Sequence, residues 1–279
     1  MVRLVDEYGI AFVRWDHNRD LIDAGSTRAG RAGVHAQTLA AYRLMAELRE
    51  ACPGLEIEAC SSGGARVDLG VLEHADRVWA SDCIDAHERQ QIQRWTAQLL
   101  PPELVGSHVG GERAHTTGRR LDLPFRAATA LFGHFGIEWD LAAASPAERR
   151  ELAGWVALYK RHRALIHAGR VVRRSADDDS LWLHGAVSPS RDEALYALTL
   201  RERPVTWPSG RVRLPGLDAD TVYRVRAVGV DVPPANSGRH PGWWDDGARM
   251  PGRALATIGL DIPALDPDTS VVLHVVAEV

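Results

Sequence analysis

Apolar positions divide the chain into two regions with different periodicity. In the first 168 residues, short apolar runs alternate with longer segments in which apolar residues recur every three or four positions. The runs predict buried strands and the longer segments predict helices. Strands are expected at residues 10–15, 55–60, 77–81, 104–109 and 135–139, and helices at residues 34–52, 65–74, 87–100, 123–132 and 146–167.

Repeated alternation of strand and helix is typical of parallel βα units. At this spacing the pattern predicts an α/β fold in which residues 1–168 form the C-terminal half of a (β/α)8 TIM barrel, strands four to eight. Beyond residue 169, apolar residues occupy alternate positions between turns rich in Pro and Gly. This second pattern predicts an antiparallel β-sandwich domain over residues 169–279.

Composition narrows the classes of function that the chain can have. Hydrophobic residues make up 45% of the 279 residues, charged ones 25%, and the net charge is −4. The chain therefore lacks the concentrated positive charge that nucleic acid or an anionic membrane requires. Cys52, Cys60 and Cys83 fit neither a disulfide framework nor a zinc site, and no cofactor or metal is expected. Neither a signal peptide nor a membrane span is visible, so a cytoplasmic location is expected.

Two predicted strands end in an aspartate. Asp16 follows Trp15 at the end of the first strand, and Asp82 comes three residues after Trp79 at the end of the third. The carboxyl ends of barrel strands face the active site, and a pair of carboxylates there suits glycoside cleavage. Taken alone, each aspartate is more often a turn residue or a helix cap than a catalyst.

The segment Cys60–Gly64, of sequence CSSGG, lies between these aspartates at the end of the second predicted strand. Its glycines would let the backbone approach a ligand and start a helix whose N–H groups bind oxygen. A tight turn between strand and helix is the alternative. A catalytic thiol at Cys60 is not favoured, because no histidine is placed as its base.

Four segments in this order resemble the α-galactosidases of glycoside hydrolase family 36. They are FVRWDHNRD, EACSSGGARVDLG, VWASDCIDAHERQ and VGSHVGG, and the likeness continues through TTGRRLDLPFRAATALFGHFGIEWDL and MPGRALATIGLDIP. In that family, K-W-D-x-N-R carries the nucleophile, C-x-S-G-G binds galactose and W-x-S-D carries the acid/base. The resemblance covers most of the chain, and four linked motifs are far more specific than one.

By position in these motifs, the resemblance implies that Asp16 is the nucleophile and Asp82 the proton donor and later the base. The implied reaction is retaining hydrolysis of terminal α-D-galactosyl residues in α-galactoside oligosaccharides. Retention calls for carboxyl groups about 5–5.5 Å apart. The implied sugar-binding residues are Arg14, Trp15, Asn18, Cys60, Gly63 and Trp79.

The chain departs from the family pattern at two places. Arg14 stands where the family has a sugar-binding lysine, which keeps the charge but leaves the hydroxyl contact open. Cys83-Ile84 follows Asp82 where the family often has Asn-Thr, a change expected to alter selectivity around the departing group. Of the other polar residues, Asp85 is expected to cap a helix rather than bind at the rim of the site. His17, His108 and His115 are expected to be solvated rather than to line the site, and residues 177–179 to form a solvated turn rather than a metal site.

The resemblance also implies a large β-sandwich and three barrel strands ahead of residue 1, carrying further galactose ligands. On this interpretation we expect little activity from the chain alone. An uncovered parallel edge favours aggregation or a homo-oligomer. Two interpretations stay open. One is an α-galactosidase, or a related enzyme acting on another α-linked sugar; the other is a non-catalytic remnant or sugar-binding module.

Overall fold

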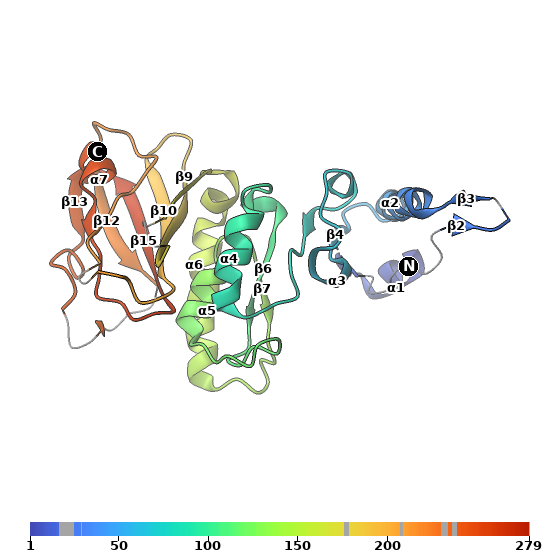
Figure 1. Cartoon of the computed structure of the whole chain (residues 1–279), viewed down its shortest axis with the longest axis horizontal. Helices are drawn as coiled ribbons and strands as arrows, with labels where there is room; N and C mark the ends of the chain where they lie inside the picture. The colour runs from blue at the N-terminus through green and yellow to red at the C-terminus, as the bar shows by residue number, and fades with distance from the viewer. Residues whose placement is uncertain are drawn as a thin grey trace. The chain divides into compact units, whose positions relative to one another are not determined.

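The computed structural model describes residues 1–16, 25–28, 30–175, 179–206, 209–229, 234–235 and 239–278. The chain forms two compact units. Unit 1 comprises Met1–Cys83 with Leu104–Gly106, and unit 2 comprises Ile84–Glu103 with Ser107–Val279. Figure 1 colours the elements in chain order. The domain boundary expected between residues 168 and 169 stays a prediction.

Unit 1 contains a short parallel sheet with the strand order β1-β4-β5. Its register places Val13 opposite Ile57 and Glu58 opposite Arg77. Val105 makes a further parallel bridge to Val78 of β5. The elements are α1 (Val2–Tyr8), β1 (Phe12–Trp15), β2 (Gly25–Ser26), β3 (Arg31–Ala32), α2 (Val34–Ala51), β4 (Glu56–Ala59), α3 (Ser61–Gly64), η1 (Val71–Glu73) and β5 (Arg77–Val78).

The helix predicted over residues 65–74 is wrong. Only Val71–Glu73 is helical there, as a single 3-10 turn. Asp68 explains the difference, because its Oδ1 accepts a hydrogen bond from the Val71 N–H at 2.8 Å and its Oδ2 accepts one from the Tyr42 hydroxyl at 2.6 Å. An aspartate that binds the backbone three residues on favours a turn over a continuing helix.

Three helices and most of a strand pair form the first part of unit 2, and the first residue of the pair, Gly106, belongs to unit 1. Each helix starts at an acidic or hydroxyl cap: Asp85, Asp122 and Ser145, the last within a capping box with Glu148. The elements are α4 (Ala86–Thr96), η2 (Pro102–Leu104), β6 (Gly106–Gly110), α5 (Leu123–Ala130), β7 (His134–Glu138) and α6 (Pro146–Ala168), with β6 paired to β7.

A six-stranded antiparallel sheet forms the rest of unit 2, in the order β13-β12-β15-β10-β9-β8. Its strands are β8 (Arg170–Ser175), β9 (Leu181–Val187), β10 (Glu193–Leu200), β12 (Val222–Val228), β13 (Ala248–Pro251) and β15 (Thr269–Ala277). A second pair joins β11 (Arg211–Val212) to β14 (Leu260–Asp261), and α7 spans Gly252–Thr257. The predicted antiparallel region is therefore confirmed.

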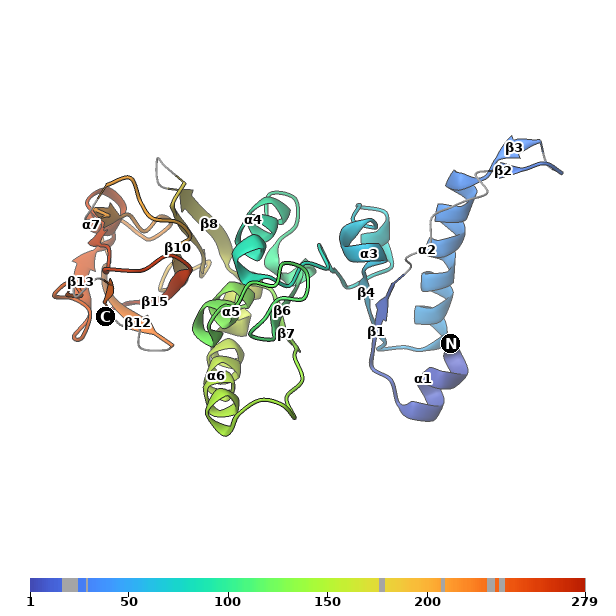
Figure 2. The same cartoon turned by 60° about the horizontal axis from the view of Figure 1, so that its bottom comes forward.

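The large sheet is buried on both faces. Tyr196, Leu198 and Leu273 pack into a core with residues of β12, α7 and the loops. Leu195, Ala186 and Val272 point the other way and pack against residues of α5 and α6 such as Ile166. Figures 1 and 2 both show these helices alongside the sheet. Among the described residues, no helix combines the length and the apolar character needed to cross a membrane.

Candidate active site

The predicted site residues gather at one edge of the parallel sheet in unit 1. Asp16 follows β1, Cys60 follows β4, and Trp79 and Asp82 follow β5. Because β1, β4 and β5 are parallel neighbours, their carboxyl ends share that edge. Asn18 and His17 lie outside the described residues.

The segment Ser61–Gly64 forms an unusual turn at this edge. All four residues have positive φ, with values of 63° at Ser61, 53° at Ser62, 68° at Gly63 and 111° at Gly64. Serine in the left-handed region is strained by roughly 1–2 kcal/mol, so the surrounding contacts must hold it there. One such contact runs from the Ser62 backbone N–H to Asp16 Oδ1, at 3.1 Å. The turn thus gives the expected nucleophile a fixed hydrogen-bond donor.

The glycines of the same turn touch the backbone that carries Asp82. A Cβ on Gly63 would overlap the Asp82 backbone nitrogen and lie 2.9 Å from Asp82 Cγ. A Cβ on Gly64 would lie 3.0 Å from the carbonyl carbon of Ala80. These glycines permit a close approach to the protein's own Asp82, and their expected approach to a ligand stays a prediction. The turn therefore contacts both aspartates. The Ser62 N–H donates to Asp16, and Gly63 packs against Asp82.

The predicted sugar-binding side chains converge on one oxygen of Asp82. Its Oδ1 accepts hydrogen bonds from Arg14 Nη2 at 3.1 Å and from Trp79 Nε1 at 3.1 Å. The Cys60 thiol lies 3.8 Å from the same oxygen and also accepts a contact from Arg14 at 3.4 Å. The Arg14 guanidinium lies over the buried Trp79 ring, 4.7 Å from its centre. These contacts fix the direction in which the carboxyl group points.

Cys60 serves as a neutral donor in this arrangement. Burial raises the pKa of its thiol, and the hydrogen bonds from Arg14 and the Gly63 backbone lower it by less. A thiol with a raised pKa is a poor nucleophile at neutral pH. The structure thus gives no support to thiol catalysis, and the sugar-binding role of Cys60 stays a prediction.

Glu58 is a charged residue of the site that the sequence did not single out. Its side chain on β4 is only 1% exposed, and its two oxygens lie 3.9 Å from Arg14 Nε and 3.3 Å from Arg77 Nε. Gly106 makes room for it, because a Cβ there would sit 2.5 Å from Glu58 Oε2. Arg14 therefore has two acidic neighbours, Asp82 at 3.1 Å and Glu58 at 3.9 Å. An acid inside the apolar strand LEIEAC was the available signal.

The remaining polar candidates mostly have structural partners. Asp85 caps α4 by accepting from the backbone N–H groups of His87 and Glu88, and it also accepts from Arg119 at 2.9 Å, so the cap prediction is confirmed. His108 pairs with Glu138 at 3.1 Å. His115 is exposed, as expected.

Trp15 is half-buried beside Asp16, and its carbonyl oxygen accepts hydrogen bonds from the Cys60 N–H at 3.0 Å and from Arg66 at 3.4 Å. Of the acidic run, Asp179 falls within the described residues and accepts from Arg94 at 3.0 Å. Where a metal is concerned, the described part of the chain contains one group of three suitable side chains, His162, Glu193 and His274, all in unit 2.

In chemical terms, unit 1 offers two carboxyl groups after β1 and β5, the strands on either side of β4, and each accepts a hydrogen bond from a neutral donor. Asp82 accepts from the Trp79 indole N–H and also from the cationic Arg14 side chain. A carboxylate fixed by a backbone N–H can attack an electrophilic carbon, and a second carboxyl nearby can exchange a proton with a leaving oxygen.

Comparison with known proteins agrees with this chemistry. The family described as Melibiase matches residues 1–169, and the glycosyl hydrolase family 36 C-terminal domain matches residues 181–275. An α-galactosidase of Escherichia coli is 39% identical over 276 residues, which cover 97% of this chain and 39% of that protein. The α-galactosidase AgaA of Geobacillus stearothermophilus is 33% identical over 228 residues, covering 79% of this chain and 31% of that protein.

Solved structures give the same result. The α-galactosidase of Lactobacillus brevis superposes with a TM-score of 0.86 at 26% identity, over 99% of this chain and 37% of that one. A variant of AgaA in complex with stachyose has a TM-score of 0.86 at 28% identity, with the same coverage. The chain thus spans less than half the length of the relatives it matches.

Proposed function

Because the chain belongs to the melibiase family, glycoside hydrolase family 36, we propose that it carries the catalytic pair of a retaining α-galactosidase. The observation that carries this proposal is the turn Ser61–Gly64. It donates a backbone hydrogen bond to Asp16 and packs its glycine against Asp82. One short segment thereby holds both carboxyl groups at the same sheet edge.

In the proposed reaction, Asp16 attacks the anomeric carbon of the galactosyl residue as Asp82 gives a proton to the departing glycosidic oxygen. The bond to the leaving sugar breaks and a galactosyl ester of Asp16 forms. Asp82 then removes a proton from water, which attacks the same carbon and releases galactose with its original configuration. The Ser62 N–H steadies the Asp16 carboxylate before attack and after release.

The substrate class follows from the relatives. AgaA variants have been solved in complex with raffinose and with stachyose. We propose terminal α-galactosyl groups of such oligosaccharides as substrates of this chain, with Arg14 and Trp79 at the sugar. On the same basis, β1, β4 and β5 would belong to a (β/α)8 barrel, and the antiparallel sheets of unit 2 would form the β-sandwich of residues 169–279.

Sugar binding without turnover is a second candidate function, and one contact favours it. Arg14 Nη2 donates to Asp82 Oδ1 at 3.1 Å and so occupies one oxygen of the proposed acid/base. A proton donor must present a carboxyl oxygen to the departing glycosidic oxygen. For hydrolysis, Arg14 has to leave Asp82 for a sugar hydroxyl as the substrate binds.

Hydrolysis of p-nitrophenyl α-galactoside tests the proposal in two settings. In the first, the chain is assayed alone; in the second, it replaces the matched segment within the E. coli relative. We expect turnover in at least the second setting. Asp16→Gly should abolish it, and added azide should restore a reaction that yields β-galactosyl azide. Asp266→Gly, at an exposed aspartate of unit 2, is the matched control and should keep activity. Galactose binding with no turnover in either setting would establish the second candidate instead.

A further inference from the structure

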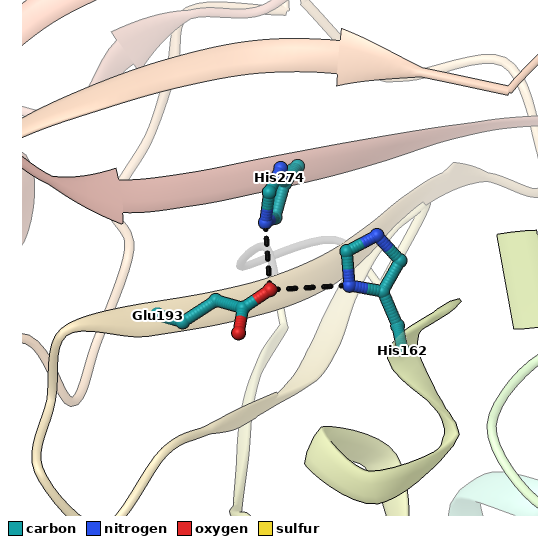
Figure 3. Close-up of side chains that lie close together, drawn as sticks. All are labelled: His162, Glu193 and His274. Carbon is teal, nitrogen blue, oxygen red and sulfur yellow. Dashed lines mark hydrogen bonds and ion pairs between the residues drawn. The ribbon is translucent and has the colours of Figure 1, made fainter. Parts of the chain in front are cut away.

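Three ligand-type side chains from three separate elements meet in unit 2. His162 comes from the second-last turn of α6, Glu193 begins β10, and His274 lies on β15. Figure 3 shows the Glu193 carboxylate between the two imidazole rings. The strand register explains part of this arrangement. Because His274 pairs with Leu195, Glu193 lies diagonally from it, two residues along on the same face of the sheet.

The three side chains already converge on one point. Glu193 Oε1 lies 3.2 Å from His162 Nδ1 and 2.8 Å from His274 Nε2. The ligand atoms of all three residues fall within 4.8 Å of one another, and the ring centres of the histidines are 4.6 Å apart. The surrounding contacts of α6 with the sheet are apolar, through residues such as Leu165, Leu195 and Val272. The cluster is therefore a polar group placed at the margin of a hydrophobic layer.

From this geometry we propose that His162, Glu193 and His274 bind one divalent transition-metal ion, with zinc as the reference ion. Two imidazoles and one carboxylate form a donor set that zinc uses in proteins. In a tetrahedral site with ligand bonds of about 2.1 Å, neighbouring ligand atoms are about 3.4 Å apart. The His162–Glu193 separation is close to this value, and the His274–Glu193 separation needs to open by about half an ångström.

Exposure of the cluster fits an ion that enters from one side. The His162 side chain is 3% exposed, whereas those of His274 and Glu193 are 25% and 38% exposed. Water can therefore reach the side formed by His274 and Glu193 and fill the fourth position. Arg226 of β12 is the cross-strand partner of His274, and the Glu193 carboxylate supplies the negative charge of the proposed ligand set. Bound metal would tie α6 to β10 and β15.

The proposal is independent of the proposed hydrolase function, because all three ligands belong to unit 2 and the proposed catalytic pair to unit 1. It is tested on the full chain, treated with chelator and titrated with ZnCl₂ in a calorimeter. Cobalt(II) serves as a spectroscopic probe, since its visible absorption intensifies in tetrahedral coordination. Thermal unfolding is followed with and without zinc, because a ligand that binds only the folded state raises the midpoint.

Two variants distinguish a metal site from a link between α6 and the sheet that consists of hydrogen bonds alone. Glu193→Gln keeps an oxygen that can accept from both histidines but removes the charge, and His274→Ala removes one partly exposed ligand. His35→Ala, at an exposed histidine of α2, is the matched control. We expect one zinc ion per chain, a raised unfolding midpoint, and at least a tenfold loss of affinity in both cluster variants but not in the control.

Two outcomes would overturn the proposal. One is zinc or cobalt binding that Glu193→Gln and His274→Ala leave unchanged, which would place the ion elsewhere. The other is a wild-type chain that takes up no more zinc than His274→Ala does. In that case the three side chains are a hydrogen-bonded link between α6 and the sheet.

Discussion

At the scale of single residues, Gly63 is the position of the proposed site with the least space for an added side chain. Its φ of 68° lies in the left-handed region, and a Cβ would meet Asp82 at both the backbone nitrogen and Cγ. We expect Gly63→Ala to push Asp82 away from the turn and to lower kcat/KM at least a hundredfold, because displacing a reacting group by about 1 Å costs on this order. The strain should also lower the free energy of unfolding by about 1–3 kcal/mol.

Gly154 offers the control for that substitution. It lies in the middle of α6, exposed, with no atom within 4 Å of a Cβ placed there. Gly154→Ala should therefore raise the free energy of unfolding by about 0.5–1 kcal/mol through helix propensity and leave kcat/KM unchanged. Steady-state kinetics and urea unfolding of both variants give the comparison. A Gly63→Ala variant with normal kcat/KM would show that the contact with Asp82 does not position the carboxyl group.

The sequence predicted which residues gather at the site better than how they contact one another. The order of the motifs predicted that Arg14, Cys60, Trp79 and Asp82 lie close together, because they lie at or near the ends of strands that meet at one edge of the sheet. It did not predict that Arg14 reaches Asp82, since the direction of a guanidinium depends on packing against Trp79 and Glu58. His162, Glu193 and His274 have no motif spacing, as only the antiparallel register and the docking of α6 bring them together.

At the scale of elements, the start of α4 depends on one buried carboxylate. Burial raises the pKa of Asp85, but the hydrogen bonds from Thr117 and from the His87 and Glu88 backbone, together with the Arg119 guanidinium, lower it by more, so it lies below its usual value. A carboxyl group with a lowered folded-state pKa stabilises the fold above its unfolded pKa of about 4, and this contribution disappears as the pH falls through the folded-state value.

We expect Asp85→Ala to lower the free energy of unfolding by roughly 2 kcal/mol at pH 7, through loss of the cap and of the Arg119 pair. The difference from wild type should shrink as the pH falls below about 4, where the wild-type carboxylate takes up its proton. Urea unfolding at a series of pH values measures it. Ile166→Val, a buried change without a titratable group, should cost about 0.5–1.5 kcal/mol equally at every pH. A pH-independent cost for Asp85→Ala would contradict the argument.

Element boundaries were predictable where the chain carries a chemical signal for them. Pro53-Gly54 ends the helix predicted at residues 34–52, and α2 spans Val34–Ala51. Ser145, Pro146 and Glu148 start α6 at the predicted residue. The pattern failed at residues 65–74, because apolar spacing there resembles a helix while Asp68 holds a turn through contacts with Tyr42 and Val71. A long-range contact of that kind leaves no trace in local periodicity.

At the scale of the whole molecule, the two units differ in how much apolar surface they bury. In unit 1, Tyr8, Leu39, Leu44 and Leu69 are exposed, Leu69 by 81%, and the sheet strands are four, four and two residues long. In unit 2, β10 and β15 have eight and nine residues, most of them buried in the two apolar layers on either side of the sheet. Stability should therefore be unequal along the chain.

Hydrogen exchange compares the central strands directly. β4 is paired on both sides by β1 and β5, and β10 on both sides by β9 and β15, so both lie inside a ladder and differ mainly in the core around them. Each 1.4 kcal/mol of opening free energy changes the exchange rate about tenfold. We expect amides of β4 to exchange at least a hundred times faster than those of β10. Unit 1 buries less apolar surface than unit 2, so the free energy needed to open it is smaller. Equal protection of β4 and β10 would mean that the two units open together.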